Sequence, residues 1–362
     1  MDFGLSQDQV LLKDTIRRWL EAECPTTRVR AVMESASGHD PALWRGLADL
    51  GVTGLQVPPA HGGAGLELLD VALAAEELGW ACTPGPFLGS AMATAALLAS
   101  DDTEAHRRWL PGIASGEVVA TLAIGEDSDE WDAAKLGTCA EGAALHGQKT
   151  LVPAATVADV IVVAAQDASG PGLWLVERGA RGLEVGALQG TDMTRRVATV
   201  TLRGTPATKL TGGHAAIDRA RDAGLVLLAA DAYGGARRCI DMTARYTLTR
   251  EQFGQPIGAF QAVKHQLADV VTDVEPALSL WWYAAHAWDH IPDRAERHAA
   301  LAKAHLADLF DRVTRVCTEL HGGIGFTWEY DLHLWFRRAV FDRAYLGNAE
   351  YHRARAADLA GW

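Results

Sequence analysis

The first third of the chain carries apolar residues at the spacing of an α-helix. Ser6 is a suitable N-cap for the first helix, because a serine hydroxyl accepts a hydrogen bond from a backbone N–H in the first turn. Apolar positions near helical spacing follow it, namely Val10, Leu11, Ile16 and Leu20. A loop of sequence VPPAHGGAG interrupts the pattern, which then resumes and continues to about Ala114. We therefore expect a helical N-terminal domain over residues 1–117.

Short apolar runs separated by turns replace this pattern between about Val118 and Pro206. The runs are VVATLAIG, ALHGQKTLV, ADVIVVAAQ, GLWLVE and VATVTLRG, and each has the length of a β-strand. Parallel strands need a crossover helix between each pair, and the sequence predicts no such helices here. The pattern favours a small β-barrel or sandwich over residues 118–212, and it argues against a Rossmann domain.

Long helical patterns return from Gly213 to the end of the chain. They are broken at three segments, which read REQFGQP, HIPDRAE and HGGIGF. These breaks predict about four helices and hence a C-terminal four-helix bundle over residues 213–362. The expected fold class is α+β, in the order helices, strands, helices. The pattern alone assigns no reaction to this arrangement.

Composition and charge narrow the class of protein. The chain has 362 residues, of which 49% are apolar and 22% charged, which is typical of a folded globular protein. Its net charge of −13, without a run of basic residues, argues against a nucleic acid partner. Five scattered cysteines suggest neither a metal site nor a disulfide framework. No signal peptide or spanning segment is recognised, so we expect a cytoplasmic protein without a membrane anchor.

Two groups of residues in the last third have a structural interpretation that outweighs a functional one. Val263, Leu267 and Val270 recur at helical spacing and predict a stripe that faces the core. Four tryptophans are candidates for an acyl pocket, but large aromatic residues more often fill a core; they are Trp281, Trp282, Trp328 and Trp335.

Three stretches together resemble the acyl-CoA dehydrogenase family. They are the VPPAHGGAG loop at residues 57–65, REQFGQPIGAFQ at 250–261 and ELHGGIG at 319–325. Each stretch alone is weak, since glycine pairs occur in many turns. Their order and separation, however, are similar to those of the family along nearly the whole chain. The helix, strand, helix order read from the hydrophobic pattern agrees independently.

The resemblance implies FAD as the cofactor and a dimer interface that completes its site. Arg250 is expected to hold the pyrophosphate of the FAD bound to the neighbouring subunit, because a guanidinium presents a planar fork of donors to phosphate oxygens. Gly322 and Gly323 would let the backbone approach the dinucleotide, although glycine pairs also simply break helices. The other residues that the resemblance assigns to FAD are Gln252, Phe253, Ile257, Gln261, Glu319, Leu320 and Asn348.

The reaction that the resemblance implies is α,β-desaturation of an acyl-CoA thioester, which needs a base for the α proton. Many relatives carry a glutamate where this chain has Leu346, and others carry it at the position of Gly224. Asp231 lies two helical turns beyond Gly224 and is the remaining candidate base. A structural role, in which Asp231 acts as a cap or pairs with a nearby arginine such as Arg237 or Arg238, is favoured over the catalytic one.

Residues expected beside the flavin ring also depart from the family pattern. A Trp-x-Thr stretch is common just after the G-x-K motif. Here the motif is Gly147 to Lys149, and the stretch after Thr150 reads Leu151, Val152, Pro153. Gly125 stands where a threonine is common. Proline has neither a hydroxyl nor an N–H to offer to the flavin.

The residues expected to contact a neighbouring subunit's FAD match the family, whereas those expected beside this subunit's own flavin and substrate do not. This difference favours a chain that helps to bind the FAD of a neighbouring subunit. We therefore expect one subunit of a heteromeric acyl-CoA dehydrogenase, similar to bacterial two-gene complexes. The partners would be an acyl-CoA substrate, a second dehydrogenase-like subunit or a second copy of this chain, and an electron-transfer flavoprotein. Three alternatives stay open: a homo-oligomer that uses Asp231, a non-catalytic structural subunit, and a flavin monooxygenase.

Overall fold

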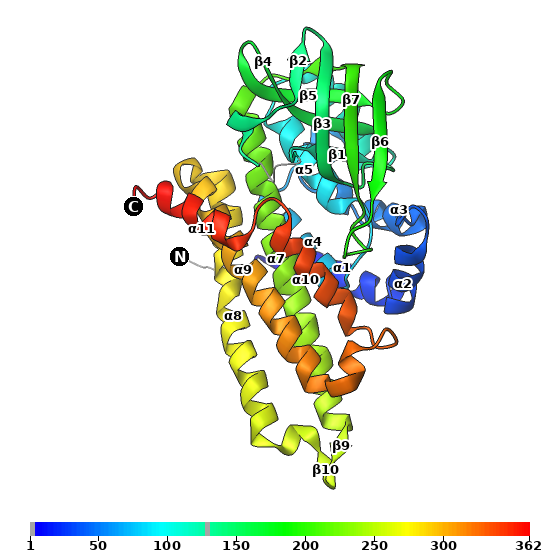
Figure 1. Ribbon diagram of the computed structural model, residues 1–362, viewed down its shortest axis with the longest axis vertical. Helices are drawn as coiled ribbons and strands as arrows, with labels where there is room; N and C mark the ends of the chain where they lie inside the picture. The colour runs from blue at the N-terminus through cyan, green and yellow to red at the C-terminus, as the bar shows by residue number, and fades with distance from the viewer. Residues whose placement is uncertain (1–3, 127–130) are drawn as a thin grey trace.

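The computed structural model describes residues 4–126 and 131–362, which form helices, then strands, then helices (Figure 1). This order confirms the expected fold class, whereas the domain boundaries at 117 and 212 stay a prediction. The N-terminal helices are α1 (Gln7–Glu23), α2 (Thr26–Glu34), α3 (Pro41–Asp49), α4 (Leu68–Trp80), α5 (Phe87–Leu98) and α6 (Thr103–Ala114), with short 3-10 turns η1 (Val52–Gly54) and η2 (Pro59–His61).

The start of α1 is fixed by its first residues. The Ser6 hydroxyl accepts a hydrogen bond from the Gln9 backbone N–H at 3.2 Å, and the Gln9 side chain accepts one from the Ser6 N–H at 3.0 Å. This reciprocal capping box satisfies two backbone donors that the helix cannot pair internally. The predicted N-cap is therefore confirmed.

The central strands form one mixed sheet. Its members are β1 (Ala120–Ala123), β2 (Cys139–Glu141), β3 (Ala144–Pro153), β4 (Val160–Asp167), β5 (Gly170–Glu177), β6 (Leu183–Leu188), β7 (Val197–Pro206) and β8 (Thr208–Lys209), with the short turn η3 (Ala133–Lys135) between β1 and β2. The strand order is β6-β7-β3-β2-β4-β5-β8, and β1 pairs with β4. Most neighbours are antiparallel, but β1 and β2 each pair with β4 in parallel.

The expectation that parallel pairs would be absent is therefore wrong. The chain makes the β1 to β4 crossover through strands β2 and β3, so no helix is needed to return it to the same direction. Three strands were also not predicted: β2 and β8 are only three and two residues long, and β6 alternates half-buried and exposed residues. In each case too few buried apolar residues are present to give a strand signal.

The C-terminal part is a bundle with one more helix than expected. Its elements are α7 (Gly213–Thr249), a hairpin of β9 (Glu251–Gln252) and β10 (Gln255–Pro256), the turn η4 (Ile257–Ala259), α8 (Gln261–His290), α9 (Pro292–His321), the turn η5 (Gly322–Phe326), α10 (Leu332–Ala344) and α11 (Ala349–Asp358). The sequence prediction missed the break between α10 and α11. The backbone turns there at Leu346 and Gly347, both of which have positive φ.

The central helix of the molecule is α7, which packs on α4, α5, α8, α9, α10 and β5. It crosses α4 at backbone distance, because a Cβ built on Gly234 would lie 1.9 Å from the Glu76 carbonyl oxygen. Only glycine permits this approach. Figure 1 shows the sheet at one end of the molecule and the β9–β10 hairpin at the other. Among the described residues, no helix is long and apolar enough to pass through a membrane.

Candidate functional site

The turn between α10 and α11 holds the first expected position for the base. Leu346 is fully buried and has a φ of 60°, a conformation that costs free energy for a residue with a side chain. Two buried side chains hold the turn. Lys303 Nζ donates to the Gly347 carbonyl oxygen at 3.0 Å, and His352 Nε2 lies 2.8 Å from the Leu346 carbonyl oxygen. These two side chains therefore hold the backbone carbonyl groups of the turn in place.

Both side chains that hold the turn have unusual pKa values. Burial lowers the pKa of Lys303 to about 7, although the carboxylates of Asp342 and Asp308 raise it. Burial, and then the charge of Lys303, lower the pKa of His352 to about 3, so that its ring is neutral and donates its Nε2–H to the carbonyl. Neither residue was predicted. The available signal was Lys303 within a stripe of buried alanines and leucines on α9.

The two positions that carry the base in relatives meet in space. A Cβ built on Gly224 of α7 would lie 2.9 Å from Leu346 Cδ1 and 2.9 Å from Met92 Cε of α5. Met92 and Leu346 are both fully buried. The pocket where a base would stand is thus filled by a leucine and a methionine against a glycine. Neither the leucine nor the methionine side chain can act as a base, and glycine has no side chain.

The expected flavin side of this pocket is occupied by an aromatic residue that the sequence prediction missed. The Trp131 ring would lie 2.6 Å from a Cβ built on Gly125, at the end of β1. It also contacts the Tyr345 ring edge to face, with 5.5 Å between centroids. Trp131 is almost completely buried. It therefore fills the space between β1 and the α10–α11 turn.

The G-x-K segment is anchored by a buried ion pair. Lys149 Nζ lies 2.8 Å from Glu126 Oε1 and donates to the Ile124 carbonyl oxygen at 3.0 Å. The regular pairing of β3 with β7 is interrupted just after Lys149. Leu151 has a φ of 53°, and the register of the two strands shifts between Lys149 and Val152. Together with Trp131, these residues do not fit an isoalloxazine ring that needs hydrogen-bond donors.

Asp231 lies in a buried cluster of charges and not at the α10–α11 turn. It forms ion pairs with Arg195 and Arg338, and the Arg338 contact is 3.1 Å. Arg338 also binds Asp192 at 2.6 Å. Burial raises the pKa of Asp231, but Arg195 and Arg338 outweigh burial and hold it below its usual value. This environment favours the structural role over the catalytic one, because a carboxylate with a lowered pKa is a weaker base.

The arginines expected to pair with Asp231 have other partners. Arg237 lies 3.7 Å from Glu76, and Arg238 stacks on the Trp80 ring at 4.3 Å. The actual partners come from the segment before β7 and from α10, far from Asp231 in sequence. Helix spacing alone therefore predicted the wrong partners.

The residues expected to bind the adenosine side of FAD gather at the opposite end of the bundle. Arg250 ends α7 and has an exposed side chain, and Phe253 at the tip of the β9–β10 hairpin is 93% exposed. Tyr246 stacks on His321 with 4.3 Å between ring centroids, which brings the end of α7 beside Gly322 at the end of α9. A Cβ on Gly322 or Gly323 would meet no atom within 4 Å among the described residues.

This end of the bundle fits a dinucleotide that comes from outside the chain. Gln252, Gln261 and Glu319 are exposed, and Ile257 and Leu320 are half-buried. Asn348 is not part of this group, because it caps α11, accepting a hydrogen bond from the Tyr351 N–H at 2.8 Å. Figure 1 shows α11 well away from the β9–β10 hairpin. The roles of all these residues stay predictions.

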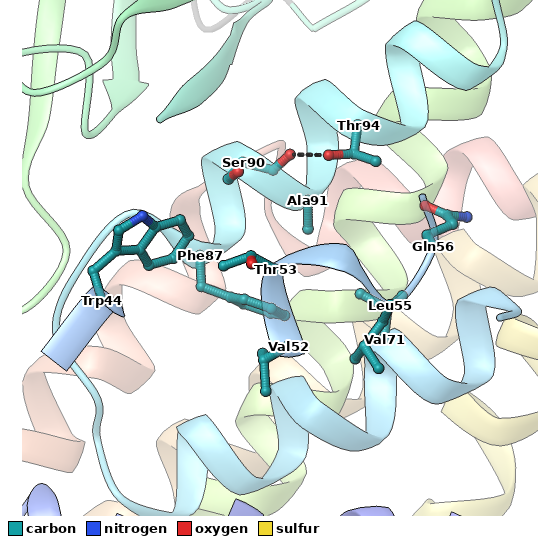
Figure 2. Close-up of a pocket in the computed structure, with 10 residues that line it drawn as sticks. All are labelled: Trp44, Val52, Thr53, Leu55, Gln56, Val71, Phe87, Ser90, Ala91 and Thr94. Atoms are coloured by element: carbon teal, nitrogen blue, oxygen red, sulfur yellow. Dashed lines mark hydrogen bonds between the residues drawn. The ribbon is translucent and has the colours of Figure 1, made fainter. Parts of the chain in front are cut away.

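A small cavity among the N-terminal helices offers no alternative reaction site. Figure 2 shows side chains from α3, η1, α4 and α5 that line it, including the Thr94 hydroxyl bonded to the Ser90 carbonyl oxygen at 2.9 Å. Its free volume is about 10 Å³, which is enough for about one water molecule. The lining residues are Trp44, Val52, Thr53, Leu55, Gln56, Val71, Phe87, Ser90, Ala91 and Thr94, and none of them is acidic or basic.

Comparison with known proteins identifies the family. Residues 6–117 match the model of the acyl-CoA dehydrogenase N-terminal domain, and residues 211–360 match that of the C-terminal domain. Acyl-CoA dehydrogenase IpdE2 of Mycolicibacterium smegmatis is 34% identical over 95% of this chain and 96% of its own length. A variant of the Tcur3481-Tcur3483 steroid ACAD has a TM-score of 0.92 at 34% identity, covering 98% of both chains. The ChsE4-ChsE5 complex from Mycobacterium tuberculosis contains a chain with a TM-score of 0.91 at 27% identity, covering 100% of this chain and 99% of that one. With its fold, motifs and relatives in agreement along almost its whole length, this protein belongs to the acyl-CoA dehydrogenase family of FAD-dependent oxidoreductases.

Proposed function

We propose that this chain is one subunit of a heteromeric, FAD-dependent acyl-CoA dehydrogenase. Its bundle end binds the adenosine side of FAD held by a partner subunit, and the partner supplies the base. The observation that carries the proposal is the contact between Leu346, Gly224 and Met92. Both positions that bear the base in relatives converge there, and both are apolar.

The reaction requires a base for the α proton, and the described residues in contact at Leu346, which are Gly224 and Met92, supply no carboxylate. FAD, when bound, supplies the acceptor for the hydride from the β carbon. A carboxylate beside the thioester must remove the α proton, and desolvation in a closed pocket raises its pKa toward the useful range. Asp231 does not meet this requirement, because two arginines hold its pKa low. A carboxylate from a second subunit meets it without any change in this chain.

Exposed apolar residues around the hairpin support an interface at the bundle end. Leu248 and Phe326 are 72% and 74% exposed. Val263 and Leu267 of α8, which the sequence predicted to be in the core, are only half-buried, whereas Val270 is buried. Apolar side chains gathered on one surface are typical of a site that another protein covers.

The names of similar proteins support a two-subunit steroid enzyme. Tcur3481-Tcur3483 is described as a steroid ACAD, and ChsE4-ChsE5 is described as a complex. By this similarity we propose a steroid-derived acyl-CoA as the substrate class. An electron-transfer flavoprotein is the proposed acceptor of the electrons.

The proposal is tested by anaerobic addition of a steroid-derived acyl-CoA to three samples. These are this chain alone, its partner alone and the copurified complex, each preincubated with FAD. We expect the flavin absorbance to bleach only in the complex. Bleaching by this chain alone would contradict the proposal and point to a base within it. Equal bleaching by the partner alone would instead make this chain a structural subunit.

A further inference from the structure

The end of α7 and the end of α9 are joined through Tyr246. The Tyr246 hydroxyl donates to the His321 carbonyl oxygen at 3.2 Å, and its ring stacks on the His321 ring with 4.3 Å between centroids. The backbone carbonyl oxygen of Tyr246 accepts from the Arg250 N–H at 2.8 Å. Tyr246 therefore contacts the residue before Gly322 with its side chain and holds Arg250 with its backbone.

The carbonyl group that Tyr246 binds is one that α9 cannot pair internally. His321 is the last residue of that helix, and the last four carbonyl groups of an α-helix have no partner within it. Gly322, which follows, has a φ of 63° and a ψ of −145°, a combination that glycine adopts readily and other residues rarely do. The Tyr246 hydroxyl therefore fixes the helix carbonyl that directly precedes this turn.

The His321 ring, on which Tyr246 stacks, is itself held at both nitrogens. Nδ1 lies 2.7 Å from the Cys317 carbonyl oxygen, which can only accept, so Nδ1 carries the hydrogen. Burial lowers the pKa of His321, so that the ring is neutral and Nε2 accepts from the Tyr330 hydroxyl at 2.8 Å. Because His321 is only 3% exposed, its ring supports Tyr246 and does not offer a contact to a dinucleotide.

The groups expected to contact the pyrophosphate lie on the outer side of Tyr246. Arg250, Gly322 and Gly323 are exposed, whereas Tyr246 is half-buried. Groups on two different helices bind one ligand well only when their separation is fixed beforehand, because ordering them on binding costs free energy. The connection from Gly322 through His321 and Tyr246 to Arg250 provides such a fixed separation.

We propose that Tyr246 is a positioning residue that holds Arg250 and the backbone of Gly322 and Gly323 at the separation required by the pyrophosphate of FAD. This inference rests on the proposed function, in which the bundle end contacts the FAD held by a partner subunit. Tyr246 acts through Arg250 and the two glycines and does not itself contact the dinucleotide.

The experiment measures the dissociation constant of FAD from the copurified complex by fluorescence titration. Tyr246→Phe is the main variant, because phenylalanine keeps the ring that stacks on His321 and removes only the hydroxyl. It is made alone and together with Arg250→Ala. Tyr283→Phe is the matched control, since it removes the hydroxyl of a tyrosine near the other end of α8, where that hydroxyl accepts from Arg294. Urea unfolding verifies that each variant folds.

We expect Tyr246→Phe to weaken FAD binding about threefold to tenfold relative to Tyr283→Phe, as the loss of one neutral hydrogen bond predicts. In the Arg250→Ala background the same change should have a clearly smaller effect, because the separation it controls then no longer matters. An equal factor in both backgrounds would overturn the positioning role. So would no effect of Tyr246→Phe while Arg250→Ala weakens binding. No effect of Arg250→Ala would overturn the proposed FAD contact together with this role.

Discussion

Replacing Arg250 with alanine is expected to reduce the affinity of the heteromeric complex for FAD by roughly tenfold to a hundredfold. Arg250 is exposed at the end of α7, and Tyr246 in the last turn of that helix stacks on His321, which precedes the open backbone of Gly322 and Gly323. Charge-assisted hydrogen bonds to a phosphate contribute about 1.5–3 kcal/mol, which corresponds to that range of affinity. The measurement is the flavin absorbance that stays with the complex during gel filtration.

The Arg250 experiment needs a control for the loss of positive charge. Arg107→Ala removes an exposed arginine of α6 that pairs only with its neighbour Glu104 among the described residues. It should leave FAD retention unchanged. If Arg250→Ala retains FAD as well as the control does, the bundle end of this chain does not bind the dinucleotide.

Asp231→Asn is expected to destabilise the folded chain by about 3–5 kcal/mol. The substitution keeps the shape of the side chain but removes the charge that faces Arg195 and Arg338. Arg338 is completely buried, so it cannot regain its hydration when this partner is lost. Breaking a buried ion pair by removing one partner typically costs that much. Urea unfolding of the two proteins measures the difference.

Asp273→Asn makes the same chemical change in an exposed ion pair with Arg312 and serves as the control. Exposed pairs contribute about 0–1 kcal/mol, so this variant should unfold almost as the original chain does. A stable Asp231→Asn variant whose complex no longer bleaches would reverse the assignment and make Asp231 the base.

The sequence predicted the features that depend on local pattern. The helix, strand, helix order followed from hydrophobic spacing, and Ser6 was correctly predicted as the N-cap of α1. Leu346 and Gly224 were identified separately as the positions expected to carry the base, and the two residues are in contact in the fold, although their role stays a prediction. Because neither position carries a carboxylate, the two together argue more strongly than either alone that this chain lacks the expected base.

Features that depend on contacts between distant segments were not predicted. Trp131 follows β1 by only a few residues, but its contact with Tyr345 joins segments more than two hundred residues apart. The partners of Asp231 come from two other elements, and hydrophobic spacing carries no information about such pairs. The parallel pairing of β1 with β4 was excluded by a rule for successive strands that does not apply to this connection.

The most direct test of the account is the visible absorbance spectrum of this chain purified alone, after FAD is added and the excess removed, compared with that of the copurified complex. Trp131 packs against Tyr345, and Leu151 and Pro153 have no side-chain donor for a flavin ring, so we expect no flavin band from the chain alone and one FAD per pair of subunits in the complex. One FAD retained per chain in the isolated protein would contradict the account and indicate a self-sufficient enzyme.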